Sequence, residues 1–158
     1  MEFESLKEIL MKDPRVQRLI AQQSSDKNKN SLILQPGNLP LKQLKIAQVM
    51  PHSIRLIIPS KDCNSQPIPN TEKYQEMVKH RFSQWSGGYT DKSGEGGYCS
   101  QSGGLMRENI TEVETWMTEM QLLQHLDELE GLMAFLLTEM NQETLMLIVD
   151  HCAVLLAL

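Results

Sequence analysis

From residue 52 onward, the spacing of apolar side chains switches repeatedly between the two-residue period of a strand and the 3.6-residue period of a helix. Residues 53–59 hold the β-branched run of a strand that ends at a proline. Residues 71–86 place apolar side chains three and four apart, with Asn70 or Thr71 as the helix N-cap and with Gly87-Gly88 as the stop signal. This alternation predicts a mixed α and β domain.

The remaining segments continue the alternation. Residues 105–117 have the Thr, Val and Trp content of a strand, although Ile110, Val113 and Trp116 are three apart and would also suit a helix. Residues 118–140 are predicted to form one long amphipathic helix. Its expected apolar stripe is Met120, Leu123, Leu126, Leu129, Met133, Leu136, Leu137 and Met140. Residues 144–158 predict one bent strand, or two short strands on either side of Asp150 and His151.

The predicted order of elements is strand, helix, two or three strands, helix and strand. This is the order of a split βαβ unit. The fold class we expect is therefore α+β, a ferredoxin-like sandwich with two helices on one face of an antiparallel sheet. Residues 1–50 are expected to be a helical N-terminal arm and linker, because residues 2–22 are amphipathic and residues 22–30 are polar and of low complexity. The compact α+β domain is predicted to span residues 51–158.

Seven of the nine glycines lie between residues 86 and 104. A phosphate-binding loop would follow a strand and lead into a helix, whereas this cluster follows a helix and leads into strands. We therefore interpret the glycines as turn residues, with residues 101–104 as a hairpin turn. No nucleotide or other cofactor is expected.

The segments IPSKDCNSQPI, WSGGYT and GGYCSQSGGLMRE occur here in that order. Together they resemble small bacterial α+β proteins of unassigned function, over about residues 54–114. The resemblance rests on residues that are typical of turns. It implies the fold and carries no catalytic residue across to this chain.

Charge and cysteine content bear on compartment and partners. Residues 1–58 hold nine Lys or Arg and five Asp or Glu, whereas residues 108–158 hold ten acidic residues and no Lys or Arg. The three cysteines are widely spaced, which argues against a disulfide framework or a zinc site and fits a reducing cytosol. With no signal-peptide pattern at the N-terminus, the protein is expected to be cytoplasmic, and no membrane contact is predicted.

The sequence shows no convergent acid, base and nucleophile. It therefore predicts a non-enzymatic binding or regulatory protein. Acid–base catalysis by Asp62 with Glu95 or Glu108 has no support beyond the presence of the carboxylates. The candidate partner-binding residues are Trp85, Tyr89, Tyr98, Asp62 and Arg107.

Two alternatives stay open. The first is a small enzyme that uses Cys63 or Cys99 with His80, and the second is a nucleic-acid-associated protein that uses the basic N-terminal arm. A homodimer is also predicted, through the uncovered sheet face or the uncharged final segment CAVLLAL.

Overall fold

The computed structural model describes residues 39, 41–99 and 103–158. The chain divides into two units, Met1–Val49 and Met50–Leu158. The described residues before Met50 form no helix or strand. The predicted amphipathic helix and polar linker lie outside the described residues.

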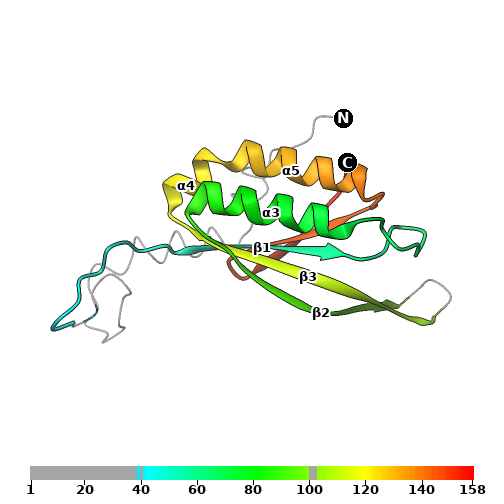
Figure 1. Ribbon diagram of the computed structural model, residues 1–158, viewed down its shortest axis with the longest axis horizontal. Helices are drawn as coiled ribbons and strands as arrows, with labels where there is room; N and C mark the ends of the chain where they lie inside the picture. Colours follow the sequence, from blue (N-terminus) through cyan, green and yellow to red (C-terminus); the bar gives the residue numbers. More distant parts are fainter. Residues whose placement is uncertain (1–38, 40, 100–102) are drawn as a thin grey trace, which may run out of the picture. The chain divides into compact units, whose positions relative to one another are not determined.

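Five strands form a single sheet in the order β2-β3-β1-β4-β5, and each neighbouring pair is antiparallel. The strands are β1 (His52–Pro59), β2 (Thr90–Cys99), β3 (Leu105–Met117), β4 (Leu145–Val149) and β5 (Cys152–Leu156). Figure 1 shows them beneath the helices. The prediction of an α+β domain with an antiparallel sheet is confirmed.

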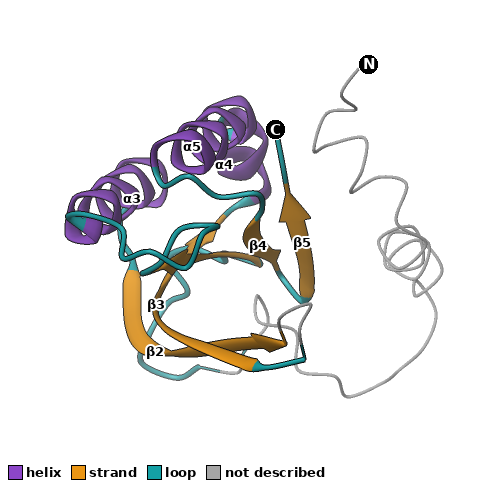
Figure 2. Ribbon diagram, turned by 90° about the vertical axis from the view of Figure 1, so that its right-hand side faces the viewer, coloured by secondary structure: helices purple, strands orange, loops and turns teal. Residues whose placement is uncertain are grey.

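Three helices, α3 (Thr71–Ser86), α4 (Glu119–Gln124) and α5 (Leu126–Glu139), lie on the same side of the sheet (Figure 2). Alternate residues of the central strands point toward them and form the core. On β1 these are Ile54, Leu56 and Ile58, each at most 1% exposed. The opposite face of the sheet is called the open face below.

Helix α3 confirms its prediction closely. Asn70 is the N-cap, and the helix ends at Gly87, whose φ of 96° is a left-handed conformation that favours glycine. Its buried side chains are Tyr74, Val78, Phe82 and Trp85.

The single helix predicted over residues 118–140 is wrong. The segment forms two helices, α4 and α5, which are separated at His125. Thr118 caps α4 with a capping box that it shares with Gln121. Met120 and Leu123, expected on the buried stripe, are 75% and 50% exposed, because only α5 presents its apolar face to the sheet.

The strand predictions agree with the structure better than the helix predicted over residues 118–140 does. Residues 105–117 are a strand, and the final segment forms two strands on either side of Asp150 and His151. The interpretation of the glycine cluster as turns is only partly right, because Gly94, Gly96 and Gly97 lie inside β2. Cys99 and Leu105, on either side of the predicted hairpin turn, are paired, while residues 101 and 102 of that turn lie outside the described residues.

The β2–β3 hairpin reaches beyond the rest of the sheet. Residue Ile110 of β3 pairs with Pro59 at the end of β1, and residues 105–109 pair with β2 alone. This part of the hairpin is a two-stranded extension, visible in Figure 1. In the described part of the chain, no helix is both long enough and apolar enough to cross a membrane.

Candidate functional site

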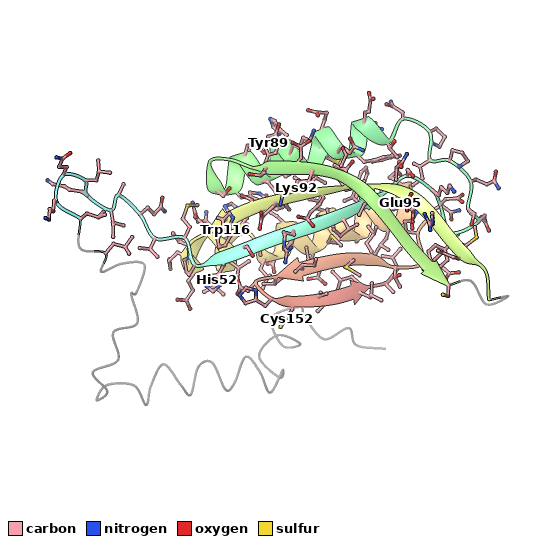
Figure 3. The ribbon with its side chains drawn as sticks, turned by 90° about the horizontal axis from the view of Figure 1, so that it is seen from below. His52, Tyr89, Lys92, Glu95, Trp116 and Cys152 are labelled. Atoms are coloured by element: carbon pink, nitrogen blue, oxygen red, sulfur yellow. The ribbon has the colours of Figure 1, made fainter. Side chains whose placement is uncertain are left out.

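A cavity of about 470 Å³ lies on the open face, at the end of the sheet where β1 stops and the two-stranded extension begins. Figure 3 looks onto this face, with the strands in front of the helices. The loop after β1, the hairpin, the segment before β4, and β4 and β5 all contribute to its lining. Its size falls within the range of about 300–1,000 Å³ that is usual for small-molecule sites.

Glu108 is the half-buried carboxylate of this cavity. It sits on β3, opposite Gly96 of β2, and one of its oxygens (Oε2) accepts a hydrogen bond of 3.1 Å from the backbone N–H of Lys61. The ammonium of Lys61 donates to the backbone carbonyl of Arg107 at 3.1 Å. Lys61 thereby holds the Glu108 side chain in place and leaves its second oxygen, Oε1, with no hydrogen bond to a described residue.

Asp62 also lines the cavity, but its hydrogen bonds stabilise the loop that follows β1. Its Oδ1 accepts from the backbone N–H groups of Asn64 and Gln66, at 2.8 and 2.9 Å, and Oδ2 accepts from the side chain of Asn141 at 3.2 Å. The backbone N–H of Gln66 is the main cause that lowers the pKa of Asp62 below its ordinary value. Asp62 is therefore an ionised turn residue that already has its partners.

An aromatic ring and apolar side chains complete the cavity. Tyr98 projects from the open face of β2, is 51% exposed, and its hydroxyl has no partner among the described residues. Ile57, Ile110 and Leu155 supply apolar surface from three different strands. The cavity thus combines a fixed carboxylate, an exposed phenol ring and an apolar floor, and its lining holds charges of both signs, among them Lys61 and Glu143, which suits a small ligand with an apolar part and a charged part.

Of the five candidate partner-binding residues, Tyr98, Asp62 and Arg107 come together at this cavity. Arg107 also forms an ion pair with Glu95 at 3.3 Å. Whether any of the five contacts a partner stays a prediction.

Trp85 and Tyr89 lie elsewhere. Trp85 is 4% exposed, stacks on the ring of His125 and donates a 3.1 Å hydrogen bond to Glu128. Tyr89 precedes β2, and the ammonium of Lys79 lies 5.8 Å from the centre of its ring.

The cysteine and histidine residues of the alternative enzyme are not brought together. Cys63 lines the cavity, Cys99 ends β2, and both are exposed. His80 is an exposed residue of α3, in the helical layer, and no hydrogen bond within the described residues joins it to either cysteine. Among these residues, no group of three or more His, Cys, Asp or Glu side chains is placed to hold a metal ion.

Sequence reasoning missed what makes the site. Glu108 was considered only as a partner of Asp62, and Ile110 only for its place in the strand. The signal was present in the two-residue spacing of Met106, Glu108 and Ile110, which puts all three on one face of β3 once the segment is assigned as a strand.

Comparison with known proteins gives a fold and no family. No family model and no curated protein matches the chain. Two solved structures do match, at 12% sequence identity each. One is a phage SAM lyase in complex with S-methyl-5'-thioadenosine, with a TM-score of 0.51 over 72% of this chain and 97% of that one. The other is a phage SAM lyase in the apo state, with a TM-score of 0.54 over 74% of this chain and 97% of that one.

The chain has the fold of these lyase structures. The prediction of a non-enzymatic binding or regulatory protein is contradicted by this likeness, since the fold matched over nearly the whole of each neighbour is that of an enzyme. That prediction rested on the absence of a convergent catalytic set in the sequence. The residues that line the cavity lie far apart along the chain and meet only when the hairpin, the β1 loop and the β4–β5 strands assemble, so the sequence alone could not bring them together.

Proposed function

We propose that this protein is a lyase that binds S-adenosylmethionine, or a closely similar adenosyl sulfonium compound, in the cavity next to Glu108. The observation that carries the proposal is the fold likeness to the SAM lyase structures, which extends over 97% of each of those chains. The cavity adds a site of suitable size on the open face.

The chemistry of the cavity supports a sulfonium ligand. A sulfonium sulfur carries a permanent positive charge, so it is attracted to a carboxylate and to the face of an aromatic ring. Glu108 offers the carboxylate, with one oxygen held by Lys61 and the other available, and Tyr98 offers the ring. We assign Glu108 the electrostatic contact with the cationic sulfur and Tyr98 a packing contact beside it.

The reaction then follows from the nature of the leaving group. When the substrate's own carboxylate displaces sulfur from carbon, a carbon–oxygen bond forms and closes a lactone while the carbon–sulfur bond breaks, both electrons stay on sulfur, and the sulfur departs as a neutral thioether. S-Methyl-5'-thioadenosine, the molecule held by one of the neighbours, is such a thioether. A site that holds the sulfonium against Glu108 binds the charged substrate more tightly than the neutral product, which favours product release.

The experiment compares the wild type with Glu108→Gln. Isothermal titration with S-adenosylmethionine and with S-methyl-5'-thioadenosine measures binding, and chromatography of a reaction mixture measures formation of the thioether. Two unlike charges about 4 Å apart attract by roughly 1 kcal/mol in water and by more near a protein surface, so Glu108→Gln is expected to weaken S-adenosylmethionine binding by at least about fivefold. Because the thioether is neutral, its affinity changes by less than about threefold.

Glu130→Gln is the matched control, because Glu130 is an exposed carboxylate on α5, away from the cavity. It should behave as the wild type. A wild-type protein that neither binds S-adenosylmethionine nor forms the thioether would refute the proposed function.

Two finer assignments belong with this proposal. We propose that the first four strands and their helices form a ferredoxin-like split βαβ unit, with β5 as an addition. It is supported by the strand order β2-β3-β1-β4, in which β3 lies between β1 and the strand that follows the first helix. We also propose a cytoplasmic location, which the three free cysteines support.

A further inference from the structure

Lys61 is the residue through which the β1 loop holds the carboxylate of the cavity. Its backbone N–H donates to Oε2 of Glu108, and its ammonium donates to the carbonyl of Arg107, each at 3.1 Å. Lys61 lies beyond the end of β1, in a loop where it forms an isolated bridge with Pro67. A loop residue fixes a carboxylate only if the loop is itself fixed, so the position of Glu108 depends on what holds Lys61.

The C-terminal end of α5 has a defined geometry that bears on this loop. Asn141 has a φ of 50°, and its N–H donates to the carbonyl of Thr138 at 3.2 Å. The N–H of Gln142 donates to the carbonyl of Leu137 at 2.9 Å. The two bonds form a Schellman motif, with Asn141 as its left-handed residue and Gln142 directly after it. The motif fixes the direction in which both residues leave the helix.

Asn141 and Gln142 both contact the β1 loop. The carbonyl of Asn141 accepts from the N–H of Cys63 at 3.0 Å, and its side chain donates to Asp62 at 3.2 Å. The side-chain amide of Gln142 donates to the carbonyl of Lys61 at 2.7 Å. Of these contacts, the one from Gln142 reaches the residue that holds the carboxylate.

The orientation of the Gln142 amide is determined by its neighbours. Its Nε2 lies 2.7 Å from the carbonyl oxygen of Lys61 and 3.2 Å from that of Met140. Both neighbours are acceptors only, so the nitrogen, which carries the donor hydrogens, must face them. Only the two backbone dihedral angles of Lys61 separate its C=O from its N–H. A carbonyl held by Gln142 therefore also restricts the N–H that donates to Glu108.

We propose that Gln142 is a positioning residue for substrate binding: it holds Lys61, which in turn holds the Glu108 carboxylate beside the sulfonium. This inference rests on the proposed function, because it adds a support to the same site. Gln142 is half-buried and lines the cavity, and it acts on the ligand through Glu108. Loss of its amide therefore affects the charged substrate and spares the neutral thioether.

The test removes the amide donor of Gln142. Gln142→Met keeps a side chain of similar length, and Gln142→Ala is the second variant in case methionine disturbs folding. Asn141→Gly is the matched control, because the neighbouring amide also donates to the β1 loop, but to Asp62. Glycine also adopts the left-handed conformation of this position without strain.

Isothermal titration with S-adenosylmethionine and with S-methyl-5'-thioadenosine measures both affinities for each variant. Gln142→Met and Gln142→Ala are expected to weaken S-adenosylmethionine binding by about threefold or more, with thioether binding within about twofold of the wild type. Asn141→Gly should bind both ligands within about twofold of the wild type. Unchanged thioether binding also reports that the cavity is folded.

A double variant separates positioning from an independent effect. If Gln142 acts through Glu108, the two substitutions are not additive, because they affect one and the same carboxylate. Glu108→Gln combined with Gln142→Met should therefore bind S-adenosylmethionine no more weakly than Glu108→Gln alone.

Four results would overturn the inference. If Glu108→Gln weakens S-adenosylmethionine binding and both Gln142 variants bind it like the wild type, the positioning role is refuted and the proposed function stands. If the Gln142 variants lose both ligands equally, Gln142 supports the fold alone. If the effects add in the double variant, Gln142 acts independently of Glu108. If the wild type neither binds S-adenosylmethionine nor forms the thioether, both ideas fall together.

Discussion

At Glu128, one carboxylate joins two helices. Its Oε2 accepts from the indole N–H of Trp85 on α3 at 3.1 Å, and its Oε1 lies 3.0 Å from Nδ1 of His125, at the junction of α4 and α5. The hydrogen bond with His125, followed by the bond from Trp85, lowers the pKa of Glu128 below its ordinary value of 4.5.

A stability effect with a defined pH range follows from this lowered pKa. A carboxylate with a lowered pKa in the folded state stabilises the protein above its unfolded pKa, and this contribution is lost as the pH falls toward the folded pKa. We expect Glu128→Gln to lower the free energy of unfolding in urea at pH 7, and the difference from the wild type to shrink below pH 4.5. An equal difference at pH 7 and pH 3 would contradict this assignment.

Single residues show where sequence reasoning was limited. Trp85 was named only as a candidate partner-binding residue, and its hydrogen-bond partner Glu128 is 43 positions away and gives no local signal. Glu108 likewise depends on Lys61, which is 47 positions away. Polar residues that meet across such separations can be assigned only when the register of the sheet is known.

Elements were more predictable, because their signals are local. Strand β1 and helix α3 were expected from the spacing of apolar residues and from the proline and glycines at their ends, and two strands were one of the two alternatives for residues 144–158. The break at His125 was missed because Met120 and Leu123 continue the helical spacing into α5. His125, at the break, stacks on Trp85 of α3, a contact between elements that the local spacing cannot show.

The end of α3 offers a matched pair of substitutions. Gly87 has a φ of 96° and Gly88 has no positive φ, while an added Cβ at either would meet nothing within 4 Å. Gly87→Ala is expected to reduce the free energy of unfolding by about 1–2 kcal/mol, because only glycine adopts the left-handed conformation without strain. Gly88→Ala should change it by less than about 0.5 kcal/mol. Thermal unfolding of both variants measures the contrast, and equal effects would contradict it.

At the scale of the whole molecule, the open face and the final strand bear on self-association. The middle of the open face is crossed by charged residues, with Arg55 lying 3.9 Å from both Glu112 and Glu114. By contrast, β5 carries no charge, and its residue Leu155 is 64% exposed. Of the two surfaces predicted from the sequence, β5 is therefore the one we propose for a homodimer.

Light scattering behind size exclusion tests the dimer. We expect twice the 18.0 kDa of one chain for the wild type, and Ala153→Lys, which adds a charge to the exposed β5, to give a single-chain mass. His151→Lys, a charge added to the exposed turn before the strand, is the control and should remain dimeric. A wild-type mass near 18.0 kDa at every concentration would end the proposal.

Because of the two-stranded extension, the walls of the cavity differ in how well the rest of the sheet supports them. Tyr98 and Glu108 stand on a ribbon that β1 does not support, while Ile57 belongs to the middle of the sheet. Two-stranded ribbons twist more than wide sheets, and Lys61 ties this one to the β1 loop through Glu108 and Arg107. Because β1 does not pair with residues 105–109, bending the hairpin beyond Ile110 breaks no hydrogen bond of the β1–β3 ladder. Of the elements that line the cavity, the hairpin is therefore the one whose displacement costs the least sheet pairing.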